Sequence, residues 1–193
     1  MQHWVSPLCC VYLSVLSLCL LPLMQALRVA SLNMNGGRSA QKRALVLEVF
    51  NQKKLDVIFL QETHSDSLNE TDWGMWWGGQ YVLSHGSNLS AGVAVFFSPS
   101  LNVKILSSTE IVAGLALMVK VELLEFIFTF INVYAPNQGP ARVSVFQLLK
   151  DKLDTSVQGE CVILGGDWNV CFNVTLDRIG RGRILSRPFY CYR

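Results

Sequence analysis

Four apolar, strand-like runs in this sequence each end in a polar residue suited to metal or phosphate chemistry. The runs end at Asn33, Glu62, Tyr134 and Asp167, within the segments SLNMNG, FLQETH, NVYAPN and LGGDWN. In open α/β sheets, ligands bind outside the carboxyl ends of the strands, so residues far apart in sequence can share one site. The four runs therefore predict an α/β fold whose strand ends converge on a single pocket.

Each of these residues, taken alone, has a simpler structural interpretation. Asn, Asp and Glu directly after a strand are often turn formers or helix N-caps without a chemical role. Four such coincidences of the same kind in one chain favour a functional interpretation instead. Together they predict a metal-dependent phosphodiesterase pocket.

An ordered series of motifs links these positions: SLNMNG, QETH, WWGGQYVLSHGSNLSAGVAVFFSP, INVYAPN, GGDWN and LDR. From about Leu27 to Gly180 the series resembles the endonuclease/exonuclease/phosphatase superfamily. It is most similar to the endonuclease domain of LINE-type retrotransposons, which is related to exonuclease III and AP endonucleases. The resemblance implies an α/β fold, a two-sheet αββα sandwich of the deoxyribonuclease/exonuclease III type.

The resemblance also implies a role for each site residue in Mg²⁺-dependent hydrolysis of DNA. Glu62 would be the main carboxylate ligand of Mg²⁺, or of Mn²⁺ in its place, with Asn33 beside it as a second metal residue. Tyr134 would hydrogen-bond the scissile phosphate, and Asp167 would orient or deprotonate the attacking water. Asn169, two residues further on, would hold the phosphate near the developing charge. The implied partner is the phosphate backbone of DNA.

Two features near these motifs have open interpretations. His64 follows Glu62 by two residues and could either contact a phosphate or hydrogen-bond behind the metal residues. The tryptophan-rich segment Trp73–Gly79 could stack on nucleic-acid bases, but the favoured interpretation is a long loop anchored to the sheet. The net charge of only +2 gives no sign of a broad basic surface for nucleic acid.

The placement of histidine departs from the family pattern. The family's reaction also needs a late Ser-Asp-His element and a further aspartate, whereas His3, His64 and His85 all precede Tyr134. We therefore expect the sequence to supply roughly the first half of the fold, with one sheet lacking its partner, and to hydrolyse DNA weakly. Two alternatives remain open: a catalytically inactive retrotransposon-derived fragment, and a secreted deoxyribonuclease-like protein.

Hydrophobic patterns place further elements between the motifs. Helices are expected at Ser39–Asn51, which has an apolar stripe at helical spacing, and after NVYAPN. Strands are expected at Arg28–Leu32, Leu55–Leu60, Tyr81–Ser84, Gly92–Phe97, Asn102–Ser107, Leu115–Val121, Phe126–Val133 and Cys161–Leu164.

The two ends of the sequence differ from the predicted domain at 27–180. Residues 1–26 contain no Lys, Arg, Asp or Glu, which favours a signal peptide, with an uncleaved membrane anchor or accidental coding sequence as alternatives. A signal peptide would imply the secretory route, and only an anchor would make the membrane a partner. The odd set Cys161, Cys171 and Cys191 argues against export, which leaves a nuclear or cytoplasmic location open. The Arg-rich residues 181–193 are expected to form a disordered tail.

Overall fold

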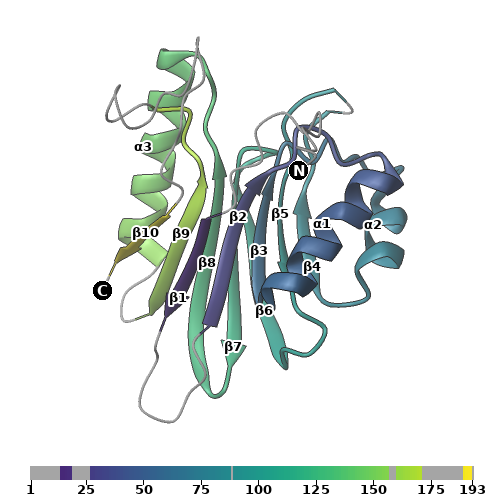
Figure 1. The fold of residues 1–193 in the computed structure, drawn as a ribbon. Helices are drawn as coiled ribbons and strands as arrows, with labels where there is room; N and C mark the ends of the chain where they lie inside the picture. Colours follow the sequence, from purple (N-terminus) through teal and green to yellow (C-terminus); the bar gives the residue numbers. More distant parts are fainter. Residues whose placement is uncertain (1–13, 19–26, 88, 157–159, 171–188, 193) are drawn as a thin grey trace, which may run out of the picture.

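The computed structural model describes residues 14–18, 27–87, 89–156, 160–170 and 189–192. Its strands form two five-stranded sheets (Figure 1). The first sheet has the order β1 (Ser14–Leu18), β2 (Leu27–Asn33), β3 (Val57–Gln61), β5 (Val93–Phe97) and β4 (Tyr81–Ser84). The second has the order β10 (Phe189–Tyr192), β9 (Cys161–Asp167), β8 (Phe126–Tyr134), β7 (Ala116–Leu123) and β6 (Val103–Val112). The helices are α1 (Ala40–Lys53), α2 (Glu70–Trp77) and α3 (Gly139–Ser156).

The two sheets pack face to face and form the inner layers of a four-layer arrangement (Figure 1). The core between them takes apolar residues from both sheets, among them Val29, Phe59 and Phe130. Helices α1 and α2 cover the outer face of the first sheet, and α3 covers the outer face of the second. The expected αββα sandwich is therefore confirmed. The expectation that one sheet would lack its partner is wrong, because β6, β7, β8 and β9 supply the second sheet.

The central strands of the first sheet explain why this chain folds into layers. Strands β3 and β5 have the sequences VIFLQ and VAVFF, and every residue in them is buried. Such unbroken apolar runs need cover on both faces of the sheet. The second sheet covers one face, and the two helices α1 and α2 cover the other.

Helix α2 replaces the long loop that the sequence predicted around the tryptophans. Trp73 and Trp77 are four residues apart, so they share one helix face and are buried against Phe96 of β5. The helix ends at Gly78, whose φ of 73° is the left-handed conformation favoured at a helix C-terminus. Packing is thus the role of these two tryptophans, and their burial rules out base stacking by them.

Each end of the sequence contributes an edge strand. Strand β1 lies within residues 1–26 and pairs antiparallel with β2. Strand β10 lies within residues 181–193 and pairs antiparallel with β9, so the prediction of a disordered tail is wrong for residues 189–192. The other residues of both segments lie outside the described residues. In the described part of the chain, no helix is long and apolar enough to cross a membrane.

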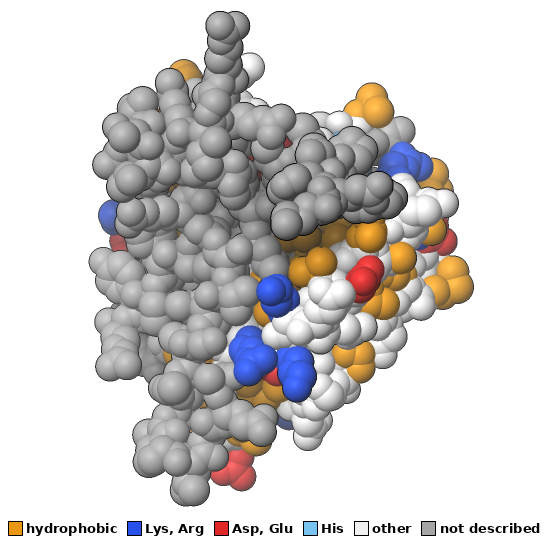
Figure 2. Space-filling model, viewed as in Figure 1, with side chains coloured by type: hydrophobic (Ala, Val, Ile, Leu, Met, Phe, Trp, Pro, Cys, Tyr) orange, Lys and Arg blue, Asp and Glu red, His pale blue; other side chains and the backbone are white. Residues whose placement is uncertain are grey.

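Basic side chains gather on the lower part of the face shown in Figure 2. Arg28, Lys53 and Lys54 are exposed near the end of α1, and Arg28 Nη1 donates a hydrogen bond to the Lys53 carbonyl oxygen at 3.2 Å. Arg28 lies near the start of β2, whereas Asn33 ends that strand. These charges therefore lie at the opposite end of the sheet from the strand ends that carry the predicted site.

Candidate active site

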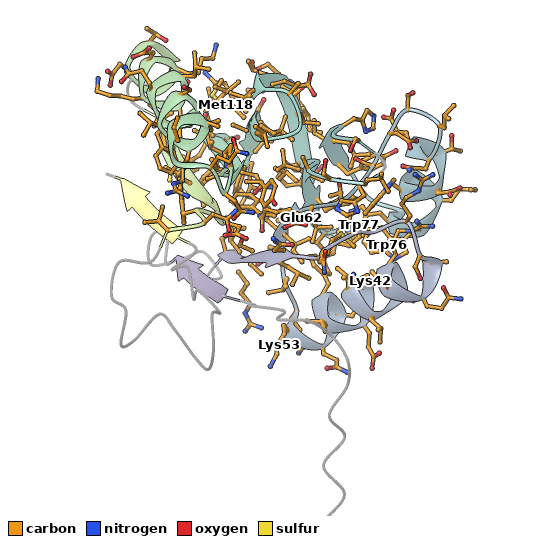
Figure 3. The ribbon with its side chains drawn as sticks, turned by 90° about the horizontal axis from the view of Figure 1, so that it is seen from above. Lys42, Lys53, Glu62, Trp76, Trp77 and Met118 are labelled. Atoms are coloured by element: carbon orange, nitrogen blue, oxygen red, sulfur yellow. The ribbon has the colours of Figure 1, made fainter. Side chains whose placement is uncertain are left out.

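The polar residues at the predicted strand ends come together at one end of the sandwich. Strands β2 and β3 run parallel, as do β8 and β9, so Asn33 pairs with Gln61 and Tyr134 pairs with Asp167 at their carboxyl ends. In a view onto this end, Glu62 lies near the centre of the molecule, between the helices of the two outer layers (Figure 3). The structure therefore gathers all four strand-end residues in one place.

The two-residue repeat of the strands aims three of these side chains into the space between the sheets. Val29 and Phe130 lie in the inter-sheet core, and Asn33 and Tyr134 follow them by four residues on the same strand faces. Asp167 likewise follows Ile163, an inter-sheet core residue of β9, by four residues. The site is therefore the polar end of the inter-sheet layer.

Glu62 reaches this layer through an unusual backbone conformation. Its φ is 49°, in the left-handed region that few residues other than glycine adopt, and this turn breaks the strand alternation. The carbonyl oxygens of Glu62 and Thr63 accept hydrogen bonds from the backbone N–H groups of Gly36 and Gly37, at 2.7 and 2.8 Å. The turn is thus held against the loop between β2 and α1. Backbone conformations of this kind cluster at functional sites.

Asn33 bridges two carboxylates. Its Nδ2 donates to Glu62 Oε1 at 2.8 Å and to Asp167 Oδ2 at 2.9 Å, while its Oδ1 accepts from the Asn35 backbone N–H at 2.9 Å. Carboxylates held this close repel each other, and a nearby cation relieves that repulsion. Because Asn33 offers the carboxylates its nitrogen, a metal could bind it only at Oδ1, whose second lone pair remains available beside the bond from the Asn35 N–H.

The donor set suits a hard cation that keeps much of its water. Among the described residues, no group of three or more His, Cys, Asp and Glu side chains could hold a metal ion. Mg²⁺ is commonly bound through one or two carboxylates, with water and substrate oxygens filling its other positions. Glu62 provides one such carboxylate, and Asp167 lies close by, because Asn33 Nδ2 contacts both, at 2.8 and 2.9 Å.

Tyr134 completes the second sheet's side of the site. Its half-buried phenol has a pKa raised well above the ordinary value, first by burial and then by the negative charge of Glu62 and a hydrogen bond to it. The charge of Asp167 acts in the same direction, and a hydrogen bond involving Asn169 opposes it. The hydroxyl therefore keeps its proton near neutral pH and remains a hydrogen-bond donor.

Asp167 and Asn169 are held by backbone contacts at the end of β9. The Asn169 N–H donates to Asp167 Oδ1 at 3.1 Å, and Asn169 Nδ2 donates to the Ala135 carbonyl oxygen at 2.6 Å. Arg142 Nη1 donates to the Asn169 carbonyl oxygen at 2.9 Å. Asn169 also has a φ of 47°. These contacts fix the loop after β9 to the loop after β8.

His64 lies beside Glu62 at the edge of the site. Its Nε2 is 3.7 Å from Glu62 Oε2, and this nitrogen is buried without a hydrogen-bond partner. Gly36 leaves room for the ring, because a Cβ there would lie 3.0 Å from His64 Nδ1. A hydrogen bond behind the predicted metal residues and a contact with phosphate both stay predictions for His64.

Sequence reasoning missed three buried polar residues beneath the site. Ser31, Gln61 and Asn132 are at most 2% exposed, and they hydrogen-bond one another across the inter-sheet core. The available signal was the polar residue inside an otherwise apolar run, in VASLN, FLQE and FINVY. Buried polar groups need partners.

Comparison with known proteins agrees with this fold. The Endonuclease/Exonuclease/phosphatase family matches residues 30–186, and the chain belongs to this family. The transposon TX1 uncharacterized 149 kDa protein of Xenopus laevis is 36% identical over 152 residues, which are 79% of this chain and 11% of that protein. The chain therefore spans about a tenth of the length of this relative.

Solved structures share the fold at lower identity. A humanized TDP2 of D. rerio has a TM-score of 0.60 at 19% identity, over 76% of this chain and 67% of that chain. TDP2 of D. rerio complexed with single strand DNA product gives 0.58 at 18%, over 78% and 63%. An AP endonuclease from Archaeoglobus fulgidus gives 0.57 at 22%, over 76% and 59%. At these identities the likeness shows the fold.

Proposed function

We propose that this site hydrolyses phosphodiester bonds of DNA with the help of Mg²⁺, or of Mn²⁺ in its place. One observation carries the proposal: Asn33 Nδ2 contacts the carboxylates of Glu62 and Asp167 from different sheets, at 2.8 and 2.9 Å. At these strand ends, a carboxylate could hold a cation, and an amide and a protonated phenol could donate hydrogen bonds; a cation and such donors suit the stabilisation of a phosphate that gains negative charge.

Each site residue would have a role in hydrolysis that follows from its chemistry. Glu62 would hold the cation, and Asn33 would orient both carboxylates. When bound, the cation would polarise a phosphoryl oxygen and offset the charge that develops on it. Asp167 would orient a water molecule and accept its proton. Tyr134 would donate a hydrogen bond to the phosphate.

Asn169 is the second phosphate donor in this proposal. Its Nδ2 contacts the Ala135 carbonyl oxygen at 2.6 Å, so it would have to turn toward a bound phosphate. The bond from the Asn169 backbone N–H to Asp167 Oδ1 holds the residue next to that carboxylate. A phosphate bound beside Asp167 would therefore lie within reach of the amide.

DNA as the substrate is supported by the chain's relatives. The Xenopus laevis relative belongs to a transposon, and two fold neighbours are a TDP2 complexed with single strand DNA product and an AP endonuclease. Two basic residues lie between β2 and the first turn of α1: Arg38 is half exposed and 3.5 Å from Asp66 Oδ2, and Lys42 Nζ contacts the Asn35 carbonyl oxygen at 2.6 Å. Basic side chains beside a site attract the negatively charged phosphate backbone of DNA.

The 193 residues alone are expected to act weakly. No histidine follows Tyr134 in this sequence, and losing one preorganised donor to a developing oxyanion typically costs about a hundred- to a thousandfold in rate. The same observation favours the alternative, a catalytically inactive fragment that binds metal or DNA. His64, whose Nε2 is 3.7 Å from Glu62 Oε2, is the candidate for a substitute donor.

Nicking of supercoiled plasmid tests the proposal. We expect slow nicking with Mg²⁺ that stops on chelation and in Asp167→Asn, whereas Asp154→Asn on the exposed face of α3 keeps it. Equal nicking by wild type and Asp167→Asn would refute the site assignment. No nicking by wild type, together with Mg²⁺ binding that needs Glu62, would support the inactive alternative.

A further inference from the structure

A polar bridge crosses the apolar core between the two sheets. Asn132 of β8 is fully buried, and its Nδ2 donates to the carbonyl oxygens of Leu60 and Ala94, each at 2.8 Å. Its Oδ1 accepts from Gln61 Nε2 at 2.6 Å. One side chain of the second sheet therefore contacts two adjacent strands of the first sheet, β3 and β5.

Every hydrogen-bonding atom of this amide has a partner. The bridge continues through Gln61, whose Nε2 also donates to Ser31 Oγ at 3.0 Å. Ser31 is likewise buried, on β2. The bridge therefore joins β2, β3 and β5 to β8 through a satisfied buried network. Such a network restricts the arrangement of the packed elements in a way that apolar contacts alone do not.

The position of the bridge relates it to the site. Leu60 and Ala94 are directly paired across β3 and β5, and Asn132 contacts both. Glu62 follows Leu60 by two residues, and Tyr134 follows Asn132 by two. Tyr134 pairs with Asp167 in the sheet, and Asn33 Nδ2 joins Asp167 to Glu62 at 2.9 and 2.8 Å. Two residues of strand span only about 7 Å. A shift of β8 along β3 would therefore move Tyr134 relative to Glu62 by nearly the full shift.

We propose that Asn132 is a positioning residue, which fixes β8 against β3 so that Tyr134 of the second sheet meets the Glu62 carboxylate of the first. This role would serve the proposed function, and only the expected change in kcat rests on that function. The strand face supports it: Phe128 and Phe130 precede Asn132 on the same face and pack against the first sheet. Apolar contacts of that kind tolerate sliding, whereas bonds to fixed carbonyl oxygens do not.

The test replaces the amide by a side chain of similar size without hydrogen bonds, Asn132→Leu. The matched control is Thr129→Val, which removes another buried polar group from β8. The Thr129 hydroxyl donates to Glu160 Oε2 at 2.5 Å, and this bond does not involve the site residues. The readout is the nuclear Overhauser contact between the Tyr134 ring protons and the Glu62 side chain, assigned with Tyr134→Phe. This contact needs neither metal nor activity.

We expect Asn132→Leu to fold cooperatively and to lose or weaken this contact, while Thr129→Val keeps it. Where nicking is measurable, Asn132→Leu should lower kcat at least tenfold with KM nearly unchanged, and adding Tyr134→Phe should lower it little further. An unchanged contact in Asn132→Leu, or an equal loss in Thr129→Val, would overturn the proposal.

A second variant covers the case in which Asn132→Leu does not fold. Asn132→Ser keeps a polar group that is too short to reach all three partners, and the same contact is measured in it. If both variants fail to fold while Thr129→Val folds, Asn132 serves folding and not positioning, and the proposal is wrong. Absence of nicking by wild type would count against the proposed function alone, because the Overhauser contact still tests the positioning role.

Discussion

Replacing Gly166 by alanine should damage both the fold and the site, because a side chain at this position of β9 would clash with the backbone of β8. A Cβ at this position would lie 1.9 Å from the Val133 carbonyl oxygen and 2.7 Å from two other Val133 backbone atoms. The φ of 144° is also one that L side chains rarely adopt. Val133 pairs with Gly166 in the parallel ladder, and the next pair is Tyr134 with Asp167.

The magnitude follows from these two penalties. A backbone conformation of this kind costs roughly 1–3 kcal/mol, and overpacking in a rigid core costs about the same again. We therefore expect Gly166→Ala to lower the free energy of unfolding by roughly 2–6 kcal/mol. The strands must separate by about 1 Å to admit the methyl group, and misplacing a catalytic group by that distance can cost about a hundredfold in rate.

Urea unfolding measures the first effect, and plasmid nicking or Mg²⁺ binding measures the second. Gly139→Ala is the matched control, because nothing lies within 4 Å of a Cβ built there, at the first residue of α3. It should keep or gain up to about 1 kcal/mol of stability. A Gly166→Ala variant with the wild-type urea midpoint and slope would refute the reasoning.

Three further predictions concern the site itself. Glu62→Ala should abolish Mg²⁺ binding in calorimetric titration, because it removes the carboxylate expected to hold the ion; equal affinity in the variant would show otherwise. Asp167→Asn should lower nicking by about a hundred- to ten-thousandfold, without a matching loss in the urea midpoint. Burial and the Glu62 charge raise the pKa of Tyr134, so its proton is bound more tightly in the folded state. That contribution to stability is complete below about pH 10, the usual pKa of tyrosine, and is lost as pH rises through the higher folded-state value. Tyr134→Phe should therefore lose less stability than wild type in alkaline unfolding titrations, and identical alkaline profiles would contradict this.

The strand ends could be predicted from the sequence because their signal is local. Each of Asn33, Tyr134 and Asp167 closes a run of apolar residues, and the two-residue repeat of the strand carries the direction of the last core side chain into the site. Glu62 follows the same rule in position, but its direction depends on a left-handed turn. Hydrogen bonds from the β2–α1 loop, which is remote in sequence, support that turn. The residues around Glu62 therefore give no local signal that predicts the left-handed conformation.

Pairing of the strands lies beyond such local signals. The runs at Val103–Val112, Ala116–Leu123 and Phe126–Tyr134 read as strands, yet their assembly into a second sheet depends on contacts among them. The expectation of an unpartnered sheet failed for that reason. Helix α2 was missed because it is only eight residues long, ETDWGMWW, and carries Gly74 in its interior, where glycine disfavours a helix.

A buried polar residue in an apolar run is the sequence signal that carries most of the remaining information. Burying an amide without hydrogen bonds is costly, so Gln61 and Asn132 must each have a hydrogen-bond partner. The sequence does not identify which residue that partner is. In the structure they partner each other across the two sheets, directly below the contact between Glu62 and Tyr134. The apolar core, the polar bridge and the site therefore follow one another along the strands in the space between the two sheets. If Asn132 positions β8 as proposed, a change in the packing of the two sheets would reach the chemistry through this bridge as well as through the contact between Asn33 and Asp167, even when it alters none of the residues that would touch DNA.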